Sequence, residues 1–316
     1  MSDVDSLSIK DLKSLIEKAG LTYADCLDKS DLRERAREAE RLLAASVAKQ
    51  ATPQGGSSSQ ASSAFVTRKL GGYECLVSAP AEVLNGSSSA DFAIIMLHGL
   101  GATSRDLTDV GEILLRQALA KKSAVLVFPQ APHDPMMGAA WWTLDAMKFM
   151  ALSTADEKTV AQAIREEPRG LDKCRAQLST LLRETRELAG GAGTPLPSKR
   201  VLLGGFSQGA MTALDTALNQ TNEEQVAGVA FLSGAPIVVE QWASRLKAHR
   251  GLRVLVTHGR ADMLLPLQCS EWVRDLLQQH GAKVSYHTHA GGHDLGGPDL
   301  AKELVAFAED CLSTPL

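Results

Sequence analysis

The sequence predicts an α/β fold in which helices cover both faces of a mainly parallel sheet, with a small helical domain in front of it. Three observations lead to this prediction. Short apolar runs alternate with helical stretches in residues 64–316, a Gly/Ser-rich segment precedes them, and residues 1–49 carry helix signals. Strands that are apolar along their whole length are typical of parallel sheets, because helices bury both faces. With 316 residues, the chain is long enough for one large domain and one small one.

Residues 1–49 predict a helical hairpin. Ser8 precedes IKDLKSLIEKAG, and Asp11 follows three residues later, which is a capping pattern for a first helix. Ser30 is the candidate cap of a second helix, because it precedes a stretch rich in helix formers. The hairpin is similar to small SAP-like domains and to the C-terminal helical domain of ARMET-type neurotrophic factors.

The Gly/Ser/Gln-rich segment 50–63 has no means of packing and predicts a linker, so residues 64–316 are expected to form a separate domain. Two apolar runs before residue 80 are compatible with a hairpin. Six further apolar runs predict the remaining strands: 92–99, 124–130, 201–206, 226–234, 253–259 and 283–289. Polar residues and glycines gather at the carboxyl ends of these runs, where sheets of this type bind ligands.

A G-x-S-x-G pentapeptide, GFSQG, stands at the end of one of these runs. In such a nucleophile elbow the serine occupies a strained strand-to-helix turn, and its neighbours must be small where strand and helix cross. The Ser207 hydroxyl would then project above the sheet. The backbone N–H of Gln208 would point to the position where a tetrahedral oxygen forms.

A nucleophilic serine needs a base, and the base needs an orienting carboxylate. In this fold the chain order is serine, acid, histidine. Asp262 follows the run 253–259, and His293 lies in a glycine-rich loop after the last run. We therefore predict Ser207 as nucleophile, Asp262 as acid and His293 as base.

A second oxyanion donor is expected at the end of an earlier strand. The sequence His98-Gly99-Leu100-Gly101 follows an apolar run, and its glycines let the backbone approach a substrate closely. The Leu100 N–H is the predicted donor, beside that of Gln208. His98 and His258 both precede a glycine at a strand end, and we expect hydrogen-bonding roles for them, structural or in support of the site.

The ordered motifs LHGLG, FPQAP, GFSQGA, LSG, HGRAD with LLP, and GGHD resemble the acyl-protein thioesterase/carboxylesterase/lysophospholipase family of α/β-hydrolases. The resemblance covers about four fifths of the chain. It implies an α/β-hydrolase fold, the triad roles given above, and Leu100 and Gln208 as backbone donors. It also implies an acyl ester or acyl thioester substrate, with S-acylated proteins and lysophospholipids as candidates.

Residues 133–157 hold four of the eight methionines and two of the four tryptophans. Methionine-rich surfaces adapt to apolar chains of varied shape, and in the family this region covers the acyl-binding groove. Trp141, Trp142 and Met147 are therefore candidate acyl contacts. The alternative is an ordinary packed flap.

Other classes of function have weaker support. The net charge of −4 and the balance of nine Lys/Arg against ten Asp/Glu in residues 1–49 argue against nucleic-acid binding, so a protein is the expected partner of the hairpin. His287, His289 and His293 lack carboxylate or cysteine partners at metal-ligand spacing, so no metal is expected, and a serine triad needs no cofactor. Five dispersed cysteines, no secretory signal and no apolar run of bilayer length predict a cytoplasmic location without integral membrane association.

The sequence thus predicts a serine hydrolase that cleaves acyl esters or thioesters through an acyl-enzyme. Two alternatives stay open. The chain could be an interaction or scaffold protein that acts through its hairpin, although an intact Ser/Asp/His set argues against this. It could also be another hydrolase on the same fold, such as a peptidase or a dienelactone hydrolase. A cysteine nucleophile would favour a dienelactone hydrolase, and this chain has a serine there.

Overall fold

The computed structural model describes part of a first unit and most of a second. The described residues are Leu12, Leu15, Ile16, Arg33, 35–37, Ala39, 65–120, 122–144, 162–191 and 193–313. The two units are Met1–Ala61 and Ser62–Leu316. The described residues of the first unit are helical, and Leu12, Ile16, Ala36 and Ala39 are buried. The rest of the predicted hairpin and the predicted linker 50–63 lie outside the described residues, so that division and the hairpin's partner stay predictions.

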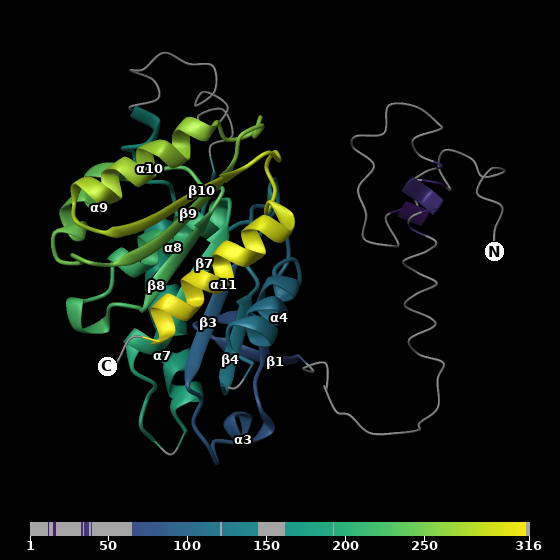
Figure 1. Cartoon of the computed structure of the whole chain (residues 1–316), viewed down its shortest axis with the longest axis vertical. Coiled ribbons are helices and arrows are strands. Elements are labelled where there is room, and N and C mark those ends of the chain that lie inside the picture. Colours follow the sequence, from purple (N-terminus) through teal and green to yellow (C-terminus); the bar gives the residue numbers. More distant parts are fainter. Residues whose placement is uncertain are drawn as a thin grey trace. The chain divides into compact units, whose positions relative to one another are not determined.

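An eight-stranded sheet forms the centre of the second unit (Figure 1). Its strands are β1 (Val66–Leu70), β2 (Tyr73–Ser78), β3 (Phe92–Leu97), β4 (Ala124–Pro129), β7 (Val201–Phe206), β8 (Gly228–Leu232), β9 (Arg253–Gly259) and β10 (Lys283–His289). They are ordered β1-β2-β4-β3-β7-β8-β9-β10. β1 pairs with β2, and β2 with β4, in antiparallel fashion, whereas all later pairs are parallel. The predicted mainly parallel α/β fold is confirmed.

Helices cover both faces of this sheet. They are α3 (Ala81–Leu84), α4 (Thr108–Gln117), α7 (Leu171–Gly190), α8 (Gln208–Leu218), α9 (Val239–Leu246), α10 (Leu267–Gln279) and α11 (Gly297–Ser313), with short 3-10 helices at Ser198–Arg200 and Asn222–Glu224. One apolar core lies between the sheet and α7, α8, α9 and α10, and a second lies between the sheet and α4 and α11. In Figure 1, α4 and α11 lie in front of the sheet.

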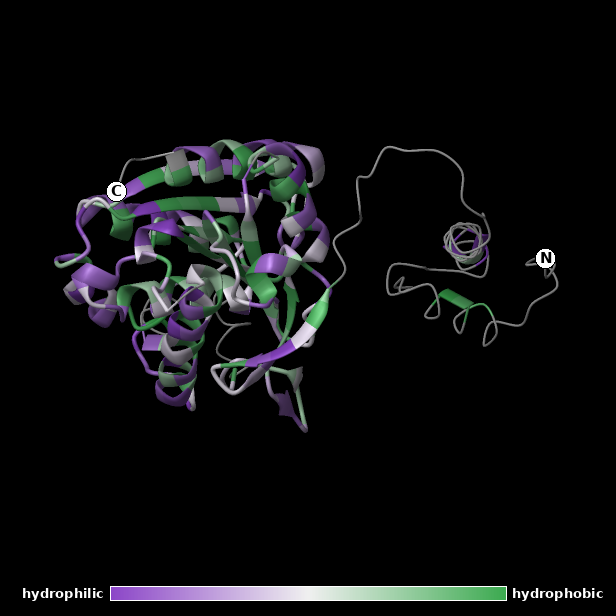
Figure 2. Cartoon of the chain, turned by 90° about the horizontal axis from the view of Figure 1, so that it is seen from below, coloured by the Kyte–Doolittle hydropathy of each residue, from purple (hydrophilic) through white to green (hydrophobic). Residues whose placement is uncertain are grey.

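The central strands are apolar on both sides because each side meets a core. Along β3, Ala93, Ile95 and Leu97 belong to the core under α7 and α8, whereas Phe92, Ile94 and Met96 belong to the core under α4 and α11. This alternation follows the two-residue period of a strand. Figure 2 shows the same layering, with hydrophobic strands between helices that carry both hydrophobic and hydrophilic residues. Among the described residues, no helix has the length and apolar character needed to cross a bilayer.

A second, two-stranded sheet is present that the sequence does not predict. It is formed by β5 (His133–Asp134) and β6 (Gly138–Ala139), which follow the carboxyl end of β4. Its turn is built by Asp134, whose Oδ1 accepts the backbone N–H groups of Met136 and Met137. The Gly101 N–H donates to Ala139 O at 2.7 Å, so this hairpin lies against the loop that follows β3.

Candidate active site

The Ser207 turn has the geometry of a nucleophile elbow. Ser207 follows β7, caps α8 and has φ 55° and ψ −120°, a left-handed conformation that strains a residue with a side chain. The flanking glycines are needed for close packing. A Cβ on Gly205 would lie 2.4 Å from the Gly209 carbonyl carbon, and one on Gly209 would lie 2.0 Å from Leu97 O. Only glycine at both positions lets β7, α8 and the end of β3 meet without a shift.

The three predicted triad residues lie in one hydrogen-bonded chain. His293 Nε2 is 2.9 Å from Ser207 Oγ, and His293 Nδ1 is 2.7 Å from Asp262 Oδ2. Because an ionised carboxylate only accepts, Nδ1 carries the proton that is donated to Asp262. Nε2 of a neutral His293 is then free to accept the Ser207 hydroxyl proton. Residues from the ends of β7, β9 and β10 meet here because these parallel strands end at the same edge of the sheet.

Asp262 is held as an ionised carboxylate. Its Oδ1 accepts the backbone N–H groups of Leu264 at 2.9 Å and Leu265 at 2.8 Å. Its Oδ2 accepts from His293 and lies 3.3 Å from His258 Nε2. Burial alone would raise the pKa of Asp262, but the hydrogen bonds from His258, His293 and the Leu265 N–H hold that pKa well below its usual value.

His258 is thus a second histidine that lies against Asp262. It is fully buried, and its Nε2 lies 2.8 Å from Leu265 O, so Nε2 carries a proton and donates. Its Nδ1 has no hydrogen-bond partner among the described residues. The sequence predicts a hydrogen-bonding role for His258 but does not indicate its partner. The available signal was its position at the end of β9, four residues before Asp262.

The loop that carries His293 is fixed by its neighbour Asp294. The Asp294 carboxylate accepts the N–H groups of Gly292 at 2.8 Å and Gly296 at 2.7 Å. The Asp294 carbonyl accepts the Ser233 hydroxyl at 3.3 Å. These bonds hold the imidazole in position from both sides of the loop. Nothing in the sequence pattern around Asp294 indicates this role.

The two backbone N–H groups predicted as oxyanion donors are those of Leu100 and Gln208. Among the described residues, neither the Leu100 N–H nor the Gln208 N–H donates a hydrogen bond to the protein. The Gln208 N–H belongs to the first residue of α8, where the positive end of the helix dipole favours negative charge. The loop after β3 is close to the elbow, since a Cβ on Gly99 would lie 3.4 Å from Ser207 Cβ.

His98 sets the direction of the Leu100 N–H. Its Nε2 accepts the Ala131 N–H at 3.1 Å, so its Nδ1 carries the proton and donates to Gly99 O at 2.8 Å. Burial lowers the pKa of His98, which keeps the ring neutral. Because the Gly99 carbonyl and the Leu100 N–H share one planar peptide, fixing the carbonyl turns the N–H the opposite way.

The predicted acyl contacts need correction. Trp141 and Trp142 are each only 3% exposed and belong to the core under α7 and α8. The Trp141 indole N–H donates to His98 O at 2.8 Å, and that of Trp142 donates to Thr212 Oγ1 at 3.0 Å. Their surroundings correspond to the packed-flap alternative, because both rings are used inside the protein. Met147, the third candidate, lies outside the described residues.

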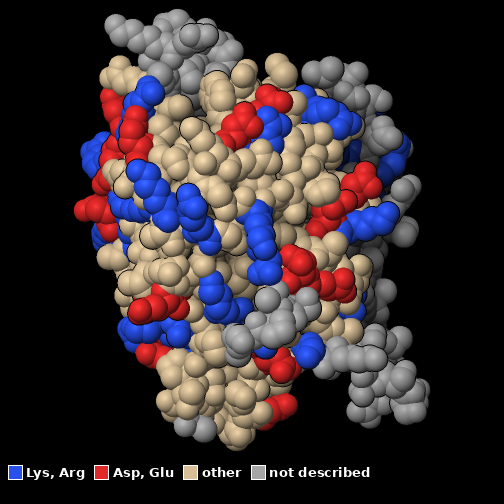
Figure 3. Space-filling view, turned by 60° about the vertical axis from the view of Figure 1, so that its left-hand side comes forward, with Lys and Arg blue, Asp and Glu red and all other residues tan. Residues whose placement is uncertain are grey.

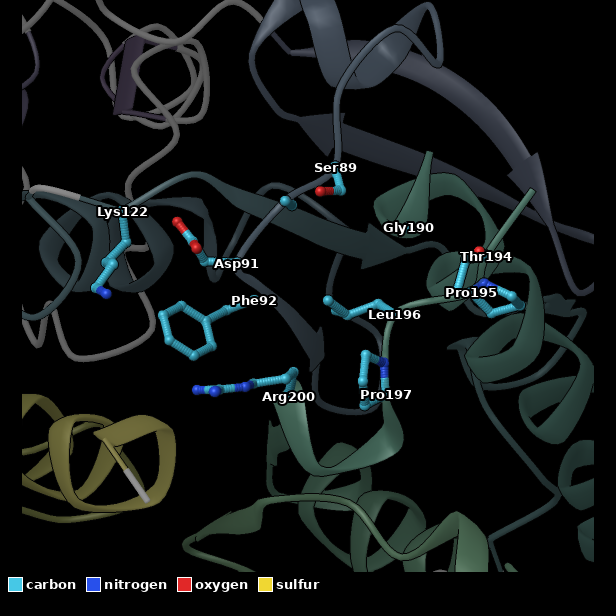
Figure 4. Close-up of a pocket in the computed structure, with 11 residues that line it drawn as sticks. Ser89, Asp91, Phe92, Lys122, Gly190, Thr194, Pro195, Leu196, Pro197 and Arg200 are labelled. Atoms are coloured by element: carbon cyan, nitrogen blue, oxygen red, sulfur yellow. The ribbon is translucent and has the colours of Figure 1, made fainter. Parts of the chain in front are cut away.

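Other features of the molecule lie apart from Ser207, His293 and Asp262. A pocket of about 400 Å³ lies at the amino ends of β3 and β7, at the opposite edge of the sheet. The Lys122 and Arg200 side chains that line it lie over the Phe92 ring (Figure 4). His287 pairs with Glu303, and the described residues hold no group of three or more potential metal ligands. On the face in Figure 3, acidic side chains lie among the Lys and Arg side chains, unlike a continuous nucleic-acid-binding surface.

Comparisons with known proteins support this fold. Residues 78–304 match a family model described as Phospholipase/Carboxylesterase. The acyl-protein thioesterase 1 of Mycosarcoma maydis is 30% identical over 231 residues, which cover 68% of this chain and 89% of that protein. The acyl-protein thioesterase 1 of Eremothecium gossypii is 28% identical and covers 72% of this chain and 92% of its own length.

Solved structures share the fold at lower identity. The crystal structure of a carboxylesterase from Mesorhizobium loti superimposes with a TM-score of 0.54 and 19% identity, covering 81% of this chain and 100% of that chain. The crystal structure of Zea mays acyl-protein thioesterase 2 gives a TM-score of 0.52 and 20% identity, covering 75% and 98% of the two chains.

Proposed function

Because the chain belongs to the Phospholipase/Carboxylesterase family and is a hydrolase of esters or thioesters, we propose that it cleaves acyl substrates with Ser207, His293 and Asp262 as its catalytic triad. The observation that carries this proposal is the hydrogen-bonded chain from Ser207 Oγ to His293 at 2.9 Å and from His293 to Asp262 at 2.7 Å. The Leu100 and Gln208 N–H groups support it, because neither donates a hydrogen bond to any described residue.

The first half of the reaction forms an acyl-enzyme. Ser207 Oγ attacks the acyl carbonyl carbon while His293 Nε2 takes the hydroxyl proton, and Asp262 stabilises the resulting imidazolium. The negative oxygen of the tetrahedral intermediate accepts the Leu100 and Gln208 N–H groups, each worth about 3–4 kcal/mol in the transition state. The carbonyl re-forms as the bond to the leaving oxygen or sulfur breaks. His293 Nε2–H protonates that leaving group, which departs as an alcohol or a thiol.

The second half releases the acid. Water attacks the carbonyl of acyl-Ser207 while His293 Nε2 takes one of its protons, and the same two N–H groups receive the second oxyanion. Collapse of this intermediate breaks the bond to Ser207 Oγ, which recovers its proton from His293. The products are a carboxylic acid and the free enzyme. Each step uses only this chain's residues and water.

Exposed apolar side chains next to Asp262 and in the β5–β6 turn support an acyl substrate. Met263 and Leu264 directly follow Asp262 and are 90% and 59% exposed, and Met136 in the β5–β6 turn is 94% exposed. Methionine side chains are flexible and polarizable, so they adapt to apolar ligands of varied shape. We therefore propose that these residues, rather than Trp141 and Trp142, meet the acyl chain. The geometry suits thioesters and oxygen esters alike.

The test compares wild type, Ser207→Ala and Ser270→Ala with p-nitrophenyl esters from acetate to palmitate and with an S-acylated peptide. Ser270 is a buried serine on α10 whose hydroxyl donates to Leu267 O and lies 3.0 Å from Tyr286 Oη, so it is a matched control outside the triad. We expect Ser207→Ala to lose about 10⁴-fold or more in kcat and Ser270→Ala to stay within about twofold. A fluorophosphonate should label wild type and Ser270→Ala, but not Ser207→Ala, by intact mass.

Each outcome of this test has a clear meaning. Equal activity in wild type and Ser207→Ala would refute the triad, and a folded wild type that cleaves none of these substrates would shift weight to the scaffold alternative. A preference for long acyl chains that is lost in Met263→Ser/Leu264→Ser would support the proposed acyl contact, whereas an unchanged preference would refute it.

A further inference from the structure

We propose that the dipeptide Trp141-Trp142 is a positioning element that aligns both oxyanion donors. This inference rests on the proposed function and deepens it, since it concerns how the same site is held together. The two donors, Leu100 and Gln208, lie on different segments of the chain, at the ends of β3 and β7. An oxyanion needs both N–H groups aimed at one point, so something must link these segments.

On the α8 side, the dipeptide clamps the Gln208 side chain. The Trp141 backbone N–H donates to Gln208 Oε1 at 3.0 Å, and Gln208 Nε2 donates to Trp142 O at 2.9 Å. The Trp142 indole donates to Thr212 Oγ1 at 3.0 Å, and that hydroxyl donates to Gln208 O at 2.7 Å. Gln208 is 2% exposed, so these bonds are made out of water and fix its orientation.

On the β3 side, the Trp141 indole holds the loop that carries Leu100. Its Nε1–H donates to His98 O at 2.8 Å, and its ring packs on the His98 ring with centroids 5.2 Å apart. His98 in turn donates to Gly99 O, which shares a peptide plane with the Leu100 N–H. Trp141 therefore acts on Leu100 through His98, and on Gln208 through its own backbone.

The burial of the dipeptide suits this role better than substrate contact. Trp141 is 3% exposed and is packed edge-on against Tyr73, with ring centroids 5.5 Å apart. The Trp141 ring thus packs against both Tyr73 and His98. Loss of its single N–H would free His98 O and leave a buried acceptor unpaired, which loosens the loop without emptying the core.

Trp141→Phe tests the proposal, because phenylalanine keeps an aromatic ring but has no N–H. Trp242→Phe is the matched control: Trp242 is also fully buried and donates its Nε1–H at 2.9 Å to a buried oxygen, that of Asp215, in a network that does not reach the donors. The measurements are kcat and KM for a p-nitrophenyl ester, the inhibition constant of a trifluoromethyl ketone that forms a tetrahedral adduct on Ser207, and the melting temperature.

For Trp141→Phe we expect kcat to fall about tenfold with KM changed less than about twofold, and the ketone to bind about tenfold more weakly. For Trp242→Phe we expect both quantities to stay within about twofold, although both variants lose melting temperature. Gln208→Met, which keeps the shape of the side chain but not its amide bonds, is the second variant and should reproduce the loss.

The outcomes separate this inference from the proposed function. Triad-dependent activity in wild type, with Trp141→Phe indistinguishable from Trp242→Phe in kcat and ketone affinity, would overturn the positioning role alone. A loss in Trp141→Phe that appears in KM rather than kcat would also overturn it and return Trp141 to substrate contact. Wild-type activity that survives Ser207→Ala would refute the proposed function and this inference together.

Discussion

Gly209→Ala should damage the site far more than its small size suggests. The added Cβ would lie 2.0 Å from Leu97 O and 2.6 Å from His98 O, both backbone atoms that cannot rotate away. Ordinary Cβ contacts in proteins are no shorter than about 3.4 Å. To lengthen the 2.0 Å contact to that distance, α8 and the end of β3 must separate by about 1.4 Å. Such a shift breaks the alignment of Ser207, His293 and the Leu100 N–H, and a misplacement of this size costs about 100-fold in rate.

The stability cost of this substitution is expected to be too small to unfold the chain at 25 °C. Overpacking a core by one methyl group costs about 1–3 kcal/mol, and each kcal/mol lowers the melting temperature of a chain of this size by about 2–4 °C. The assay is kcat/KM for a p-nitrophenyl ester at 25 °C beside a thermal melt. Gly209→Ala should therefore be folded at 25 °C and about 100-fold less active.

Gly111→Ala is the matched control for this experiment. Gly111 is a buried glycine in α4, and a Cβ there would lie 2.5 Å from Phe128 Cζ, in the core on the other side of the sheet. It should lose melting temperature and keep kcat/KM within about twofold. Wild-type kcat/KM in Gly209→Ala would refute the close-approach reasoning. An equal loss of activity in Gly111→Ala would attribute the effect to stability instead.

Three further predictions follow from burial and charge. Because the pKa of Asp262 is held below its ordinary value, its ionised form contributes stability above about pH 4 that is lost as the pH falls toward the folded-state pKa. The difference in free energy of unfolding between wild type and Asp262→Asn should thus shrink between about pH 6 and about pH 2, and a constant difference would contradict this. Burial raises the pKa of four cysteine thiols to about 12: Cys75, Cys174, Cys269 and Cys311. A thiol reagent at about pH 8 should therefore modify them only after denaturation. Rapid labelling of the native protein, located by mass spectrometry, would count against their burial. Asp215 is 1% exposed and accepts two hydrogen bonds from Arg175, at 2.6 and 2.9 Å, so Asp215→Ala should lower the free energy of unfolding in urea by about 3–5 kcal/mol, and a change below about 1 kcal/mol would show that the pair is not essential.

Local sequence was sufficient where the physical cause is local. The apolar runs 201–206 and 253–259 coincide with β7 and β9. A buried parallel strand must be apolar along its length, and such a run ends where glycine and polar residues begin. The GFSQG pentapeptide likewise predicts a strained turn, and Ser207 has the positive φ of such a turn. Its glycines are required by contacts that any such strand-to-helix crossing makes.

The supporting residues of the site could not be foreseen in the same way. His258, Asp294 and Trp141 each act through a partner that is set by the packing of another segment. Nothing near Trp141 in the sequence indicates that its indole meets His98 O or that its N–H meets Gln208. Two adjacent tryptophans in a methionine-rich stretch suggested an exposed apolar surface, and only the burial of both rings corrected that interpretation.

The sequence by itself determined the α/β class, the family and the order in which a serine, an acid and a histidine follow the strands, because strand periodicity, turn glycines and motif order are all written along the chain. The tertiary structure decided which of these residues meet, since hydrogen bonds of 2.7 and 2.9 Å depend on strand order and on where each parallel strand ends. It also decided which N–H groups remain unpaired and which side chains brace them. Those properties depend on contacts between segments that are distant in the sequence. Neither segment's own sequence shows which other segment it will contact.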